Sequence, residues 1–178
     1  MNINYDHKKV LFLDLDGTLI NTISGKDFAE DCSDFQINLP LLHSISTLMP
    51  DLEYVFIVTN QGGLGTFFEQ YELEAKLYAV VAFMERYFKE FLPMLERLDY
   101  EYCASMNPGD PRRKPNTKML TDMLFSYTGY DESSEEDRSK MLMIGDASGK
   151  PNDFSDSDKK CAEYLDIDYI DVRDFILT

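Results

Sequence analysis

The stretch LFLDLDGTLI at residues 11–20 decides the fold. It begins as an apolar run, which is typical of a strand buried on both faces of a parallel sheet. Asp14 and Asp16 stand where this strand ends, and Gly17 then lets the chain turn sharply. A buried carboxylate is costly unless something compensates its charge, so the pair predicts a bound cation or a proton-transfer role. For the two aspartates alone, an acidic loop after a core strand explains the pattern equally well.

Similar apolar runs recur along the chain and alternate with segments of helical periodicity. We expect strands at residues 53–58, 98–105, 141–144 and 167–170, and helices at residues 39–49, 67–92 and 156–165. A further helix, capped by Asn116 or Thr117, is expected to run to Tyr127, and a helical turn is expected at residues 172–177. This alternation predicts the α/β class, with a Rossmann-like parallel sheet sandwiched by helices. Because no shift of composition marks a boundary, residues 1–178 are expected to form a single domain.

Three stretches between or within these elements carry expectations of their own. Residues 21–38 are polar and irregular and directly follow the aspartates, which predicts a flap over the site. The acidic residues 131–137 are expected to form a solvated loop. Aromatic residues recur at helical spacing between residues 67 and 92, which predicts that they belong to the core. They are Phe68, Tyr71, Tyr78, Phe83, Tyr87, Phe88 and Phe91.

The charge of the chain restricts its partners. The chain has 17 Lys+Arg against 33 Asp+Glu, a net charge of −16, which argues against general affinity for nucleic acid. Several cations nevertheless fall in loops that the predicted topology places near the aspartates, so we expect a locally positive mouth on an acidic body. These cations are Lys26, Arg112, Arg113, Lys114 and Lys150.

Location is also constrained by the sequence. No apolar stretch approaches the length of about 20 residues that crosses a bilayer, and the first residues lack the apolar part of a signal peptide. The 3 cysteines are far apart and show no metal or disulfide spacing. We therefore expect reduced thiols in a cytoplasmic protein, or a nuclear one in a eukaryote.

Further polar side chains fall at predicted strand ends or in the loops that follow them, namely Thr59, Lys114 and Asp146. Because the carboxyl ends of parallel strands share one edge of a sheet, we expect these side chains to meet Asp14 and Asp16. An aspartate can attack phosphorus and form an acyl phosphate, and a second carboxylate can exchange a proton with the leaving oxygen. Asp14 and Asp146 can supply oxygen ligands for Mg²⁺, while a lysine and a hydroxyl hold the phosphoryl oxygens.

The segment GDASGK at residues 145–150 invites comparison with a nucleotide P-loop. The spacing between its glycines is one residue short, and Pro151 stands where that motif needs a hydroxyl residue. We therefore expect no kinase domain in this chain.

The order of these motifs resembles that of the haloacid dehalogenase superfamily, and the resemblance implies its fold without a large cap domain. It implies Asp14 as nucleophile, Asp16 as general acid and base, and Lys114 as the stabilising lysine. It also implies a phosphate contact from Thr59, and Mg²⁺ held by Asp14, Asp146 and the backbone carbonyl of Asp16. A second acid near the metal is left open among Asp153, Asp156 and Asp158.

A narrower resemblance covers nearly the whole chain. The matching parts are DLDGTLI with Thr22, Ser24-Gly25-Lys26 and Phe28, then TNQGG at 59–63, RKP at 113–115, GDASGK at 145–150, DFS at 153–155, Asp158 and Phe175. These are similar to the 3′-phosphatase domain of polynucleotide kinase phosphatases. The resemblance implies removal of 3′-phosphates from DNA ends, through an aspartyl phosphate. It places Thr59, Asn60, Ser24, Gly25, Lys26 and Arg113 at the substrate.

Two alternatives remain at this point. One is a small-molecule phosphatase of the histidinol-phosphate or heptose-bisphosphate type, although residues 106–113 lack the cysteines and histidine of the zinc loop usual in those enzymes. The other is a catalytically silent binding module with the same fold.

Overall fold

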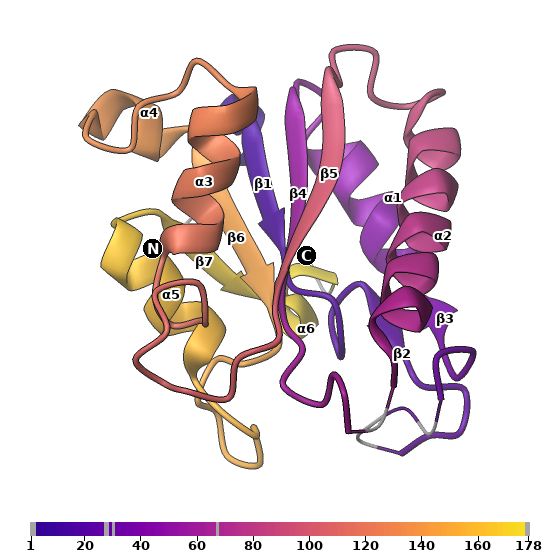
Figure 1. Ribbon diagram of the computed structural model, residues 1–178. Helices are drawn as coiled ribbons and strands as arrows, with labels where there is room; N and C mark the ends of the chain where they lie inside the picture. Colours follow the sequence, from indigo (N-terminus) through magenta and orange to yellow (C-terminus); the bar gives the residue numbers. More distant parts are fainter. Residues whose placement is uncertain (1–2, 27–28, 30, 67, 177–178) are drawn as a thin grey trace.

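The structure is a computed structural model that describes residues 3–26, 29, 31–66 and 68–176 (Figure 1). Its centre is a sheet of 5 strands in the order β5-β4-β1-β6-β7. The strands are β1 (Val10–Leu13), β4 (Tyr54–Asn60), β5 (Arg97–Cys103), β6 (Met141–Gly145) and β7 (Asp168–Asp171). All neighbouring pairs in this sheet are parallel, so the predicted doubly covered parallel sheet is confirmed.

Alternation along the strands divides the core into two layers. In β1, Leu11 and Leu13 belong to one buried cluster, whereas Val10 and Phe12 belong to the other. The first cluster includes residues of α1 (Leu39–Leu48), α2 (Gln70–Phe88) and α6 (Val172–Ile176). The second includes residues of α3 (Lys118–Tyr127) and α5 (Ser157–Leu165). Figure 1 shows α1 and α2 on one side of the sheet and α3 and α5 on the other.

Local signals fix where several helices begin. The side chain of Asn38 accepts a hydrogen bond from the Leu41 amide at 3.2 Å, and Pro40 occupies the first turn of α1. At α3, Thr117 occupies the N-cap position but makes no side-chain cap bond. Asn116 instead donates its amide to the carbonyl oxygens of Pro108 and Asp110.

Two expectations about loops were incomplete. The flap contains a short antiparallel pair, β2 (Ile20–Asn21) with β3 (Gln36–Ile37). The acidic stretch is not entirely a loop, because α4 (Glu135–Ser139) begins within it. Ser134 caps this helix by accepting from the Asp137 amide, and the acidic first turn suits the positive helix N-terminus. A 3₁₀ turn at Tyr5–His7 was also not expected.

The expected core role of the α2 aromatics was wrong for most of them. Tyr71, Tyr78 and Phe83 are 69%, 73% and 41% exposed, and Phe91, which follows α2, is 49% exposed. Phe88 is buried as expected, and the rest of the buried stripe of α2 consists of Leu73, Lys76, Leu77, Val80 and Met84. Helical spacing alone does not say which of several overlapping stripes faces the sheet. Among the described residues, no helix combines the length and the apolarity needed to cross a membrane.

Candidate active site

The carboxyl ends of β1, β4 and β6 point toward the lower edge of the molecule in Figure 1, where the loop between β5 and α3 also lies. Asp14 directly follows β1, and its amide donates to the Ile144 carbonyl of β6 at 3.0 Å. Its side chain is only 10% exposed. The topology therefore removes the first aspartate of the pair almost completely from water.

Lys114 neutralises Asp14 from the loop that precedes α3. Its Nζ lies 2.5 Å from Asp14 Oδ1 and 2.7 Å from Asp158 Oδ1, and the whole residue is 3% exposed. Burial alone lowers the pKa of Lys114, but Asp14 and Asp158 outweigh it and raise that pKa. Lys114 is therefore held as an ammonium, a charged donor directed at the oxygen of Asp14.

Asp14, Asp146 and Asp158 form a carboxylate cluster in which one oxygen of each lies within 4.8 Å of the others. Burial raises the pKa of Asp14 well above its usual range, and Lys114 opposes this shift. Burial, together with the charge of Asp158, raises the pKa of Asp146 to about 6. Lys114 balances only part of the acidic charge, and the ligand atoms are hard oxygens. The cluster is therefore compatible with a divalent metal ion of the Mg²⁺ type.

Two glycines make room for this cluster. Gly17 adopts φ of +79°, and a Cβ at this position would lie 2.3 Å from Asp146 Oδ2. At Gly145, the end of β6, a Cβ would lie 2.3 Å from Asp158 Oδ2. A side chain at either position would push a carboxylate out of the cluster.

The structure distinguishes among the acids that the sequence left open. Asp153 pairs with Arg173 at 2.9 Å, and Asp156 pairs with Lys160 at 2.7 Å. Asp158 is the one that faces Asp14 and Asp146, and it is 1% exposed. Its position on the first turn of α5, over Gly145, explains how a helix residue joins the strand ends.

Asp16 lies beside the cluster, and both of its oxygens accept hydrogen bonds. Gln61 donates to Oδ2 at 2.7 Å and also to Thr59 Oγ1 at 2.9 Å, while Lys76 of α2 lies 3.2 Å from Oδ1. Thr59 is buried, whereas the Asp16 side chain is 51% exposed. Gln61 thus links the expected phosphate ligand to the expected acid and base.

Asn60 holds the backbone of Lys114 in place. Its amide donates to the Lys114 carbonyl at 3.0 Å, and its Oδ1 accepts from the Lys114 amide at 2.9 Å. These paired bonds fix the backbone of the lysine against the end of β4, and the Lys114–Pro115 peptide bond is cis. A contact between Asn60 and substrate stays a prediction.

The expected positive mouth is only partly present. Arg112 pairs with Glu101 of β5, and Lys150 pairs with Asp171 at 3.2 Å and Asp174 at 2.7 Å. Lys114 points into the acidic cluster, where its charge is paired with Asp14 and Asp158. Arg113 donates Nη1 to the Ser105 carbonyl and is partly exposed. The cations therefore do not act as one basic patch.

Hydrogen bonds join the two ends of the flap between β2 and β3. Asp34 accepts from the Ser24 amide at 2.8 Å and from its hydroxyl at 2.7 Å. Gly25 adopts φ of +74°, and the Thr22 hydroxyl donates to the Lys26 carbonyl. The structure thus orders the Ser24-Gly25-Lys26 segment, and its contact with substrate stays a prediction. Phe28 lies outside the described residues.

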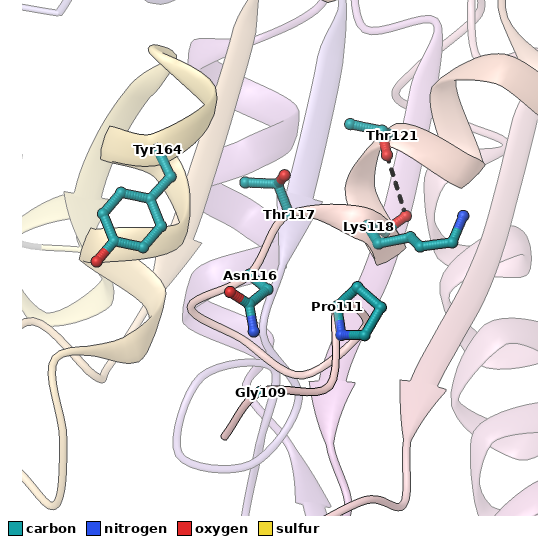
Figure 2. Close-up of a pocket in the computed structure, with 7 residues that line it drawn as sticks. All are labelled: Gly109, Pro111, Asn116, Thr117, Lys118, Thr121 and Tyr164. Carbon is teal, nitrogen blue, oxygen red and sulfur yellow. Dashed lines mark hydrogen bonds between the residues drawn. The ribbon is translucent and has the colours of Figure 1, made fainter. Parts of the chain in front are cut away.

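A pocket of about 410 Å³ lies beside the Lys114 loop rather than at the carboxylates. Figure 2 shows it between Tyr164 of α5 and the segment from Gly109 to Thr121. None of the clustered carboxylates lines it. The candidate site is therefore identified from its side-chain chemistry.

The comparisons with known proteins agree with this geometry. The family model for polynucleotide kinase 3 phosphatase matches residues 9–175. The chain belongs to this family. The suspected haloacid dehalogenase phosphatase is thereby confirmed, as is the expectation of a hydrolase.

Two relatives within this comparison differ in size. A 20.8 kDa protein from the FGF-VUBI intergenic region of Autographa californica nuclear polyhedrosis virus is 30% identical over 175 residues, covering 94% of this chain and 85% of the viral protein. The bifunctional polynucleotide phosphatase/kinase of Schizosaccharomyces pombe is 30% identical over 172 residues, covering 96% of this chain. The present chain therefore spans only 38% of the length of that yeast protein.

Solved structures support the fold. D,D-heptose 1.7-bisphosphate phosphatase from B. bronchiseptica, complexed with magnesium and phosphate, matches with a TM-score of 0.61 at 21% identity, covering 90% of this chain and 78% of that one. A HAD-like phosphatase from Mesorhizobium loti matches with a TM-score of 0.54 at 23% identity, covering 91% and 72%.

Gln61, Lys76 and the specific choice of Asp158 were missed by the sequence-based prediction. Lys76 did leave a signal, because it interrupts the apolar spacing of Leu73, Leu77 and Val80. A lysine within a buried stripe needs a partner. The partner is Asp16, and the sequence does not show that α2 packs over the turn after β1 in which Asp16 lies.

Proposed function

We propose that this member of the polynucleotide kinase 3 phosphatase family is a Mg²⁺-dependent phosphomonoesterase that removes 3′-phosphates from DNA ends. The observation that carries the chemistry is the position of Asp14, held by Lys114 beside Asp146 and Asp158. The substrate class is supported by family membership and by the yeast bifunctional relative.

In the first step, Asp14 attacks the phosphorus of the ester. A bond forms between its carboxylate oxygen and phosphorus, and the bond from phosphorus to the 3′-oxygen breaks. Asp16 gives its proton to that departing oxygen, so the product leaves as an alcohol. Lys114 and Thr59 stabilise the charge on the phosphoryl oxygens as it moves.

In the second step, water attacks the phosphorus of the aspartyl phosphate. Asp16, now a carboxylate, takes the proton from this water, and Asp14 leaves as a free carboxylate with release of inorganic phosphate. Asp14, Asp146 and the Asp16 carbonyl would hold Mg²⁺, with Asp158 as the additional nearby acid. When bound, the ion neutralises phosphoryl oxygens and lowers repulsion between the anionic substrate and the carboxylates.

The test compares a 3′-phosphorylated oligonucleotide, its 5′-phosphorylated counterpart and histidinol phosphate, each with Mg²⁺ and with EDTA. We expect Mg²⁺-dependent phosphate release that is fastest from the 3′-phosphorylated strand, and none from the Asp14→Asn variant. If the 3′-phosphorylated strand is the poorest of the three, the proposed substrate is wrong. If no substrate and no aryl phosphate is hydrolysed, the proposed enzyme is wrong as well.

A small-molecule phosphatase is the second candidate, because the ion pairs of Arg112 and Lys150 reduce the positive charge near the site. A net charge of −16 also disfavours approach of a polyanion. Preference for histidinol phosphate in the same assay, or for a sugar bisphosphate added to it, would favour this candidate.

A further inference from the structure

Lys76 lies at a buried position, where a charged side chain is energetically unfavourable. It shares the buried face of α2 with Leu73, Leu77 and Val80, and its side chain is 5% exposed. Removing an ammonium from water costs free energy unless a charged or polar partner compensates. A methionine or leucine would fill this position at lower cost, so the reason for a lysine must lie in what its Nζ contacts.

That contact is Asp16. Lys76 Nζ lies 3.2 Å from Asp16 Oδ1 and 5.8 Å from the centre of the Phe35 ring. The second oxygen of Asp16 accepts from Gln61 at 2.7 Å. Two donors from separate elements, α2 and the loop after β4, thus hold a side chain that is 51% exposed. A half-exposed aspartate in a glycine turn otherwise retains rotamer freedom.

We propose that Lys76 is a positioning residue, which fixes the Asp16 carboxyl group for proton exchange with the leaving oxygen. This inference rests on the proposed role of Asp16 as general acid and base. An ammonium donates hydrogen bonds and cannot accept one, so Oδ1 remains an acceptor. The Gln61 amide has both a donor and an acceptor, and it can face Oδ2 with or without a proton. The geometry therefore assigns proton exchange to Oδ2.

A positioning role has a chemical signature that a purely structural role lacks. A poor leaving group needs its oxygen protonated as it departs, whereas a good one leaves as an anion without help. We therefore compare kcat/KM for phosphate esters of graded leaving-group acidity, from an alkyl phosphate to a nitrophenyl phosphate. Lys76→Met should lower kcat/KM about 100-fold for the alkyl ester, as expected for a displaced catalytic group, and much less for the nitrophenyl ester.

The controls separate positioning from folding. Lys76→Arg keeps a charged donor and should restore part of the loss on the alkyl ester. Lys89→Met, at the exposed C-cap of the same helix, should match the wild type on every ester. Lys76→Met added to Asp16→Asn should cause no further loss on the alkyl ester, because the group that it positions is already inactive.

Two results would overturn the proposal. One is an equal loss on all esters in Lys76→Met, and the other is an additive loss in the double variant. If Lys76→Met does not fold, Lys76→Gln is judged by the same comparison of esters. A wild-type protein without activity on any ester would instead refute the proposed function, so the two failures are distinguishable.

Discussion

The ammonium of Lys114 lies 2.5 Å from Asp14 Oδ1, although the two residues are 100 positions apart in the chain. Both side chains are almost completely buried. A buried ion pair is weak evidence for stability, because desolvation offsets much of the attraction. The pair is better explained by the proposed chemistry, in which Asp14 attacks phosphorus and Lys114 stabilises the charge on the phosphoryl oxygens.

Replacing Lys114 with methionine should therefore affect both activity and stability. We expect kcat to fall by at least about 100-fold, as for removal of one charge-stabilising donor. In the metal-free protein at pH 7, the free energy of unfolding measured in urea should be about 3 kcal/mol lower than in the wild type, because Asp14 and Asp158 lose their buried partner. Lys118→Met, which removes an exposed lysine at the start of α3, is the control. Unchanged activity in Lys114→Met would contradict its placement in the site.

The carboxylate cluster predicts how stability depends on pH without metal. The pKa of Asp146 is raised to about 6 in the folded protein, so the folded state binds its proton more tightly than the unfolded state does. The proton-linked stabilisation is fully present below the ordinary aspartate pKa and is lost as pH rises through about 6. In EDTA, wild-type stability should thus fall relative to Asp146→Asn over this range. Parallel pH profiles for the two proteins would contradict the raised pKa.

Gly145 tests whether Asp158 needs its present position. In Gly145→Ala, the new Cβ would meet Asp158 Oδ2 at 2.3 Å, so the carboxylate must move away from Asp14 and Asp146. We expect a loss of about 1–3 kcal/mol in stability, as for overpacking, together with a large loss of activity. Gly129→Ala is the matched control, because nothing lies within 4 Å of its Cβ. Equal behaviour of the two variants, measured by urea unfolding and phosphate release, would show that Asp158 is dispensable.

The meeting of Asp14, Thr59, Lys114 and Asp146 could be predicted from sequence, because each lies at the carboxyl end of a strand of one parallel sheet or in the loop that follows it. The topology rule then places them at one edge without knowledge of any contact. Asp158 could not be chosen over Asp153 and Asp156 in this way. Its selection depends on the close approach of the first turn of α5 to Gly145, which is set by packing.

The charge of the site mouth was harder to predict for a similar reason. A cation in a loop gives no indication of whether an acid from another strand will pair with it. Glu101 on β5 and Asp171 at the end of β7 take up Arg112 and Lys150 through tertiary contacts. Exposure of Tyr71 and Tyr78 likewise depended on which helical face met the sheet.

Arg173 connects α6 to the loop after β6, which carries Asp146 and Asp153. It pairs with Asp153 at 2.9 Å and with Asp171 at 2.5 Å, and it donates to the carbonyl of Asp146 at 3.3 Å. The Arg173 guanidinium lowers the pKa of Asp153 to about 2, so Asp153 stays ionised. Because such outer contacts orient metal ligands, Arg173→Met should raise the half-saturating Mg²⁺ concentration about 10-fold. Arg86→Met, at the exposed end of α2, is the control, and an unchanged Mg²⁺ requirement would contradict this role.

The proposed DNA substrate predicts a selective effect at Arg113 and Lys26, which lie in the Lys114 loop and the flap. If they contact the phosphates of a strand, alanine at either position should weaken hydrolysis of a 3′-phosphorylated oligonucleotide more than that of an aryl phosphate. The salt dependence of oligonucleotide kcat/KM should also become shallower by about one counterion for each lost contact. Lys159→Ala, on the outer surface of α5, is the control because its lysine is exposed and pairs within its own helix. Equal losses on both substrates, with an unchanged salt slope, would mean that these cations support the site without contacting a strand.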